Sequence, residues 1–232
     1  MATKLFLALD YADPELARKM VRLALPMNPH FKIGLELFTI AGPDFVREII
    51  GEGGQVFLDL KFHDIPNTIA GAVSSAVGLG VGWLNVHCAG GTAMLEAAAK
   101  AKGETCAKLG STCSLLGVTI LTSLDDHATQ EIGYSRKISE QVPHFAKMAQ
   151  EAGLDGVVCS AQELSLVQAA CGQSFQTMVP GIRLVGASTE DQKRVVTPEV
   201  AKNSGAHCIV MGRPITAAKD PAQVLREVLG VL

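Results

Sequence analysis

Several features that would point to common classes of protein are scarce in this 232-residue sequence. Aromatic residues make up only 5% of it, the formal net charge is −3, and no basic run is longer than Lys193-Arg194. No apolar stretch approaches the roughly 18 residues that a transmembrane helix needs. These absences argue against a membrane span and against a surface that binds nucleic acid or anionic lipid. Any anionic ligand must therefore be bound by a local group of residues.

The six cysteines are scattered and include no C-x-x-C pair. Several lie in apolar, strand-like runs, which favours buried free thiols in a reducing compartment over disulfides or a metal site. The apolar run at residues 5–9 is too short for a signal peptide and is followed at once by Asp10. We therefore expect a cytoplasmic protein.

Short apolar runs alternate with amphipathic segments along the whole chain. Eight runs are candidate strands: residues 5–9, 31–34, 55–60, 83–87, 115–121, 156–159, 176–179 and 207–211. Eight segments are candidate helices: residues 14–24, 43–50, 68–77, 92–102, 138–151, 161–170, 198–203 and 222–229. Repeated strand and helix units predict an α/β fold with a parallel sheet. Eight units in this length favour a single (β/α)8 TIM barrel, with residues 1–232 as one domain.

Local signals mark the predicted helix ends. Three predicted N-cap residues stand before a proline: Asp13, Thr197 and Asp220. Four glycines stand where helices are expected to stop: Gly103, Gly153, Gly172 and Gly205. Residues 181–196 have no period and contain several small polar residues, which predicts a long loop.

The strongest sign of a functional site is the apolar strand at residues 55–60, which ends in ionisable groups. Asp59 and Lys61 lie two residues apart, so their side chains point to one face of a strand, and Asp64 follows in the loop. Buried charges are costly unless they are paired, so these residues form a paired network or mark a site. The simpler alternative is a structural ion pair, with Asp64 as an ordinary N-cap before Pro66.

Polar residues also follow other predicted strands, at the end where barrel enzymes carry their active sites. Asp10 follows the first strand, Lys32 lies within the second, and Thr122 and Ser123 follow the fifth. Chance accounts for any one of them, and Lys32 alone could be a lysine that reaches solvent. Because all of these residues are expected at the same end of the barrel, they favour a functional site there.

The loops after the last two strands predict a phosphate site. They read Pro180-Gly181-Ile182-Arg183 and Met211-Gly212-Arg213. Glycine allows close backbone approach, helix N-termini offer free N–H groups, and arginine donates two parallel hydrogen bonds to phosphate oxygens. In barrels of this type these loops commonly bind phosphate, so the substrate is expected to be a phosphate monoester.

Other ionisable residues carry less weight. His63, His87 and Cys88 lie near the same rim but lack the spacing of metal ligands, so no metal is expected. Asp125-Asp126-His127 is interpreted as a helix start with solvated charges.

One segment resembles a known family. Asp59-x-Lys61-x-x-Asp64-Ile65-Pro66-Asn67-Thr68 is similar to the motif of the orotidine 5′-phosphate decarboxylase family. The agreement covers the whole chain and includes Asp10, Lys32, Thr122, Ser123, Pro180, Arg183, Gln192, Gly212 and Arg213. The D-x-K-x-x-D core alone is shared with related phosphosugar decarboxylases and synthases, whereas Lys32 and the Ile-Pro-Asn-Thr extension narrow the match.

The resemblance implies the reaction and the residues that carry it. Lys61 would protonate C6 of the pyrimidine once carbon dioxide has left, and Asp59 would lie beside the departing carboxylate. Lys32 and Asp64 would complete an alternating charge network. No cofactor motif is present, so none is expected, because a preorganised electrostatic site can stabilise the carbanion itself.

The resemblance also implies how substrate and partner bind. Asp64, Ile65 and Thr68 would reach the active site of a second copy, which implies a homodimer with shared sites. Asp10 and Lys32 would contact the ribose, and Thr122 and Ser123 the base. The phosphate group would be held by Arg183, Gln192, Gly212 and Arg213. Pro180 would also contact the substrate, and residues 181–196 would form a lid.

Two alternatives remain open from the sequence. One is a metal-assisted phosphosugar decarboxylase or synthase, which would resemble this chain at Asp59, Lys61 and Asp64 but place an acidic metal ligand at Lys32. The other is a barrel that binds a phosphorylated ligand without turnover. Lys61 between two acids argues against the second alternative.

Overall fold

Eight parallel strands form a closed ring in which each strand pairs with the next and β8 pairs with β1. The computed structural model describes residues 2–184 and 196–232. The strands are β1 (Lys4–Ala8), β2 (His30–Gly34), β3 (Val56–Phe62), β4 (Trp83–His87), β5 (Ser114–Val118), β6 (Gly156–Val158), β7 (Gln176–Val179) and β8 (Cys208–Met211). This arrangement confirms the predicted (β/α)8 barrel.

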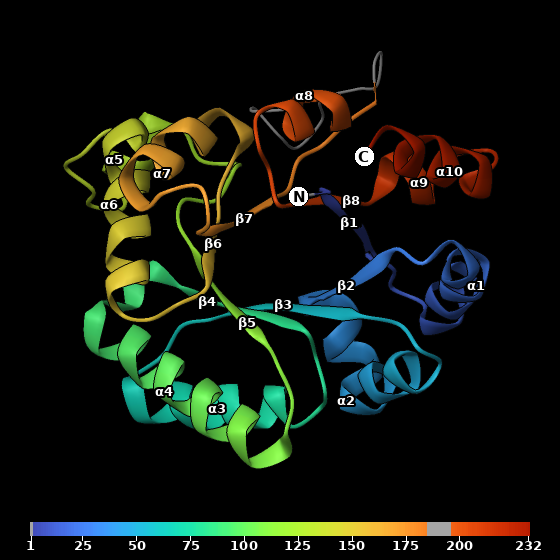
Figure 1. Cartoon of the computed structure of the whole chain (residues 1–232), viewed down its shortest axis with the longest axis horizontal. Helices are drawn as coiled ribbons and strands as arrows, with labels where there is room; N and C mark the ends of the chain where they lie inside the picture. The colour runs from blue at the N-terminus through green and yellow to red at the C-terminus, as the bar shows by residue number, and fades with distance from the viewer. Residues whose placement is uncertain (1, 185–195) are drawn as a thin grey trace.

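The helices lie outside the ring of strands and follow it in chain order (Figure 1). They are α1 (Pro14–Ala24), α2 (Leu35–Gly51), α3 (Pro66–Val77), α4 (Thr92–Leu109), α5 (Asp126–Glu131), α6 (Ile138–Glu151), α7 (Leu164–Cys171), α8 (Pro198–Asn203), α9 (Arg213–Thr216) and α10 (Pro221–Val231). Among the described residues, no helix is both long and apolar enough to cross a bilayer.

The predicted N-caps are confirmed. The side chains of Asp13, Thr197 and Asp220 each accept a hydrogen bond from a backbone N–H in the first turn of α1, α8 and α10. The helix start at Asp125 is confirmed as well, because its carboxylate caps α5. Short polar side chains before a helix thus place these boundaries from the sequence alone.

Two helices, α2 and α4, are much longer than predicted. α4 continues through Gly103 and ends at Gly110, whose φ of 62° closes the helix in the left-handed region. One interior glycine costs only about 1 kcal/mol, which the buried Leu95, Ala98 and Ala101 of α4 offset. α2 begins before residue 43 because two helical segments join across a kink at Gly42.

Apolar side chains pack in two layers. Inside the ring, a small cluster contains Phe6, Phe57, Trp83, Leu116, Met178 and Cys208. A larger cluster between strands and helices contains most of the remaining buried apolar residues. All six cysteines are among the described residues, none forms a disulfide, and five are buried. Burial raises the pKa of the Cys88, Cys113 and Cys208 thiols to about 12, as expected for unreactive core cysteines.

His30 makes the stability of the barrel depend on pH. Its ring lies 4.8 Å from that of Phe6 and 5.1 Å from that of Trp83. Burial and the nearby charge of Lys4 lower the pKa of His30 to about 4 from its ordinary 6.5. The unfolded chain therefore binds a proton at a higher pH than the folded chain does.

We expect the free energy of unfolding to fall as the pH drops from about 6.5 to about 4. His30→Phe keeps an aromatic ring and removes the titrating group. The slope of its unfolding free energy against pH should therefore be smaller, by an amount equivalent to up to about one bound proton. Urea unfolding followed by circular dichroism at pH 7.5, 6.0, 5.0 and 4.5 measures both slopes. Identical slopes for the two proteins would contradict this account.

Candidate active site

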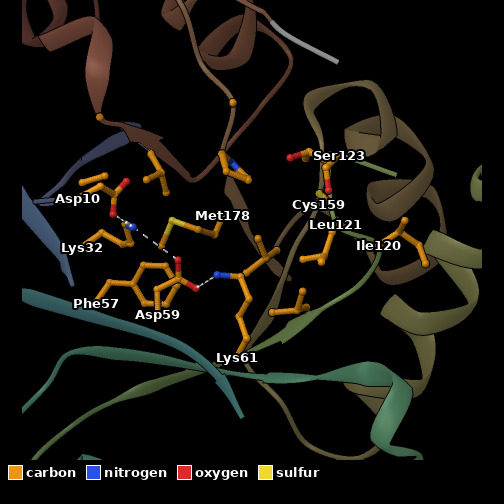
Figure 2. A pocket seen from close by; sticks show the side chains of 18 of the residues that line it. Asp10, Lys32, Phe57, Asp59, Lys61, Ile120, Leu121, Ser123, Cys159 and Met178 are labelled. Atoms are coloured by element: carbon orange, nitrogen blue, oxygen red, sulfur yellow. Dashed lines mark hydrogen bonds and ion pairs between the residues drawn. The ribbon is translucent and has the colours of Figure 1, made fainter. Parts of the chain in front are cut away.

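A cavity of about 470 Å³ opens at the carboxyl ends of the strands. Its size falls within the range of small-molecule sites, roughly 300–1,000 Å³. Figure 2 shows Asp10, Lys32, Asp59 and Lys61 linked in a row on one side of the cavity, with Ser123 and its neighbours on the other. Most of the predicted site residues that the structure describes therefore share one pocket.

Lys32 lies almost completely buried between two carboxylates. Its Nζ is 2.5 Å from Asp10 Oδ1 and 3.8 Å from Asp59 Oδ2. A Cβ at Gly34 would lie 3.0 Å from this Nζ, so glycine leaves room for the ion pair. The possibility that Lys32 simply reaches solvent is wrong, since its side chain is only 9% exposed.

Asp59 and Lys61 form the other end of the row. Lys61 Nζ donates a hydrogen bond of 2.7 Å to Asp59 Oδ1, and both side chains line the cavity. The predicted strand end at residue 60 is two residues short, because β3 runs on to Phe62. Lys61 also has a φ of 50°, unusual for a residue with a Cβ. The pairing of β3 with β4 shifts register between Leu58 and Phe62, around this residue.

Asn85 on β4 is a site residue that the sequence analysis missed. Its Nδ2 donates to Asp59 Oδ1, and its Oδ1 accepts from the backbone N–H of Lys61, both at 2.7 Å. The side chain is buried, and the residue is only 1% exposed. The available signal was an asparagine within the apolar run Trp83-Leu84-Asn85-Val86, since a buried amide requires partners.

Asp64, Ile65 and Thr68 lie apart from the cavity of their own chain. All three are exposed, Ile65 is 67% exposed, and none lines the cavity. The N-cap position of α3 belongs to Ile65 and has no side-chain bond, so Asp64 is not that N-cap. The Asp64 carboxylate instead accepts the backbone N–H of Ile65 at 2.6 Å.

Thr122 and Ser123 both line the cavity, and Ser123 lies on the side opposite Lys32 (Figure 2). They follow β5, which ends at Val118 and not at residue 121 as predicted. Ile120 and Leu121 therefore belong to the loop, although Ile120 is buried. The floor of the cavity is apolar and includes three further residues that the sequence analysis did not single out: Phe57, Val158 and Met178.

The loops after β7 and β8 both contribute to the lining of the cavity. Pro180, Arg183, Gly212 and Arg213 all line it. Ile182 forms a parallel bridge with Val196, and the Arg183 N–H donates to the Val196 carbonyl at 3.0 Å. The predicted site residue Gln192 and most of the predicted lid at 181–196 lie outside the described residues. Cationic side chains outnumber carboxylates in the cavity lining, which favours an anionic ligand.

His63 and His87 lie close together near the rim, with ring centroids 5.4 Å apart. Burial is the main cause that lowers the pKa of His87, and the neighbouring charge of His63 lowers it further. Within residues 2–184 and 196–232, no three His, Cys, Asp or Glu side chains group closely enough to hold a metal ion.

The fold and the cavity together define a class of protein. It is a (β/α)8-barrel enzyme with a lysine and aspartate centre and a lining suited to a small anionic substrate. Its substrate would enter at the carboxyl ends of the strands, where the charged row and the two arginine loops line one cavity.

Comparison with known proteins identifies the family. Residues 3–228 match the model of the orotidine 5′-phosphate decarboxylase / HUMPS family. The orotidine 5′-phosphate decarboxylase of Moorella thermoacetica is 49% identical, over 97% of this chain and 90% of that protein. The enzyme of the same name from Pseudoalteromonas translucida is 47% identical, over 97% and 95%. The crystal structure of orotidine 5′-phosphate decarboxylase from Lactobacillus acidophilus superposes with a TM-score of 0.86 at 33% identity, over 99% of both chains. This chain belongs to the orotidine 5′-phosphate decarboxylase / HUMPS family.

Proposed function

We propose that this protein decarboxylates orotidine 5′-phosphate to uridine 5′-phosphate, the last step of de novo pyrimidine synthesis. The observation that carries the proposal is the row of Lys32, Asp59 and Lys61 in a cavity that is also lined by Arg183 and Arg213. Membership of the family and near full-length relatives that bear this enzyme's name support it.

The chemistry requires stabilisation of a carbanion. The bond from C6 to the carboxylate breaks, its electron pair stays on C6, and carbon dioxide leaves. Lys61 Nζ then gives a proton to C6, and the neutral amine regains a proton from solvent. Because Asp59 holds this ammonium at 2.7 Å, the charge is in place before the bond breaks, as electrostatic preorganisation requires.

The remaining residues of the cavity would position the substrate. Asp10 and Lys32 would bind the ribose, and Thr122 and Ser123 the base. Arg183, Gly212 and Arg213 would bind the phosphate, and Gln192 is proposed to join them. Pro180 would contact the substrate elsewhere in the cavity. Phosphate lies away from the reacting carbon, so its binding energy orders the site without direct chemistry.

A homodimer with shared sites is part of the proposal. The exposed Ile65 and the neighbouring Asp64 and Thr68 lie outside the cavity of their own chain, which is compatible with their use in the partner's site. A large exposed apolar side chain is also more favourable at an interface than in water. We further propose that the enzyme is cytoplasmic, as its cysteine pattern suggests.

A metal-assisted reaction is the alternative that the family name leaves open. The Nζ of Lys32 lies between Asp10 and Asp59, where its charge would repel a divalent cation. The proposed reaction therefore uses only side chains of this protein.

Ultraviolet absorbance tests the activity directly. Purified protein with orotidine 5′-phosphate and EDTA should give a steady fall in substrate absorbance, with uridine 5′-phosphate as product by chromatography. A flat trace would overturn the proposed activity and leave a binding role. Activity that disappears with EDTA and returns with a divalent metal would favour the metal-assisted alternative.

Arg213→Ala should weaken binding of the substrate's phosphate group. We expect kcat/KM to fall by about 100-fold and KM to rise, because a charged hydrogen bond to phosphate is lost. Guanidinium ion should restore part of the loss. Arg226→Ala, an exposed arginine on α10 outside the cavity, is the control and should change neither constant. An unchanged KM in Arg213→Ala would remove this residue from the phosphate site.

A further inference from the structure

Asn85 lies behind the charged row and does not line the cavity. It sits in the middle of β4, and only 1% of the residue is exposed. Its two amide atoms bind two different parts of the same segment, the carboxylate of Asp59 and the backbone of Lys61. A residue in this place cannot touch the substrate, but it can set the geometry of the residues that do.

The backbone of Lys61 depends on this contact. A φ of 50° is costly for a residue with a Cβ. The register shift between Leu58 and Phe62 interrupts the regular pairing of β3 with β4 at this point. Asn85 Oδ1 accepts the Lys61 N–H at 2.7 Å, so a side chain takes the place of a backbone acceptor from β4.

The position of the Asp59 carboxylate depends on Asn85 as well. Asp59 Oδ1 accepts from both Lys61 Nζ and Asn85 Nδ2, each at 2.7 Å, while Oδ2 faces Lys32 at 3.8 Å. The amide has only one orientation that satisfies both bonds, because the Lys61 N–H needs an acceptor and the carboxylate needs a donor. Asn85 therefore binds both the backbone of Lys61 and the carboxylate of Asp59, which pairs with the Lys61 ammonium.

We propose that Asn85 is a positioning residue that holds the Lys61 ammonium and the Asp59 carboxylate in their reactive arrangement. This inference rests on the proposed role of Lys61 in decarboxylation. It assigns Asn85 an effect on the chemical step and little effect on substrate binding, since the phosphate and base contacts lie elsewhere in the cavity. A displacement of about 1 Å at a reacting group can lower a rate by about 100-fold.

Three variants test the inference. Asn85→Ala removes both hydrogen bonds, and we expect kcat to fall by about 100-fold with KM within about threefold of the unmodified enzyme. Asn85→Asp is isosteric, keeps the acceptor for the Lys61 N–H, and replaces the donor to Asp59 with a second carboxyl group. Thr177→Ala is the matched control, because Thr177 is fully buried on β7 and also bonds twice, to the backbone N–H and to Nδ1 of His207.

The pH profile separates positioning from simple loss of stability. The carboxyl group that Asn85→Asp introduces can donate to Asp59 only when protonated, so its kcat relative to the unmodified enzyme should rise as the pH falls from 8 to 5.5. The charged and ionisable neighbours Lys32, Asp59, Lys61, His63 and His87 are present in both proteins, so the ratio of the two kcat values removes their shared contribution. All assays run well below the melting temperature of each variant.

The outcomes are distinct. A selective fall in kcat for both Asn85 variants, full kcat in Thr177→Ala and undiminished binding of uridine 5′-phosphate by calorimetry would support the inference. The inference would be overturned if kcat of Asn85→Asp lay within about threefold of the unmodified enzyme. It would also be overturned if the ratio of these two kcat values did not change with pH. Inactivity of the unmodified enzyme, or full activity of Lys61→Ala, would instead refute the proposed function.

Discussion

Lys61→Ala is expected to lower kcat by more than about 10⁴-fold, because it removes both a proton donor and a fixed positive charge beside the carbanion. Binding of uridine 5′-phosphate should stay measurable, since the phosphate loops and the apolar floor are untouched. Stopped ultraviolet assays over hours determine the residual rate, and calorimetry determines the dissociation constant. Substantial residual decarboxylation would rule out Lys61 as the proton donor.

Lys102→Ala is the matched control for this variant. Lys102 also pairs with an aspartate, at 2.8 Å from Asp155, and its side chain is 16% exposed. This pair lies outside the cavity. The control should lower the melting temperature and leave kcat unchanged. Equal losses of kcat in the two variants would mean that breaking a partly buried ion pair, and not the loss of the proton donor, explains the effect.

A mixture of two inactive chains is expected to regain activity. Asp64→Ala should be strongly impaired as a homodimer, because each site would lack the carboxylate of its partner. In a hybrid with Lys61→Ala, one site combines an intact Lys61 with an intact Asp64, and the other lacks both. With free exchange of equal amounts, about half the dimers are hybrids with one intact site each, so about a quarter of full activity should return.

Subunit exchange must be shown for this result to be interpreted. Chains that differ in an affinity tag reveal hybrid dimers after co-purification. A mixture of Lys61→Ala with the double variant Lys61→Ala and Asp64→Ala serves as the control, because no pairing of those chains restores Lys61. Demonstrated exchange without any regained activity would contradict a shared site.

The local features of the fold were predictable from the sequence. The eight strand and helix units, three N-caps and the helix start at Asp125 follow from hydrophobic periodicity and from short polar side chains, which act within a few residues. Gly103 shows the limit of such rules: a glycine was expected to end α4, but buried alanine and leucine contacts carry the helix past it.

Part of the site was predictable for the same reason. The carboxyl ends of parallel strands meet at one rim, so Asp10, Lys32, Asp59, Lys61, Thr122, Arg183 and Arg213 could be placed together without coordinates. Which of these side chains pair with one another was not predictable. That Lys32 pairs with Asp10, or that Asn85 binds Asp59, depends on side chains 22 and 26 residues apart in the chain.

The segment at residues 59–68 shows both contributions. That a strand ends there in alternating charges, and that Asp59 and Lys61 share a face, follows from the residue order alone, because alternation along a strand is a local property. The positive φ of Lys61, its hydrogen bond to Asn85 beside a shifted register, and the absence of Asp64 from the lining of its own cavity became visible only in the folded chain. The reason is physical: strand register and the closure of a barrel are set by the packing of the whole ring, which no short stretch of sequence contains.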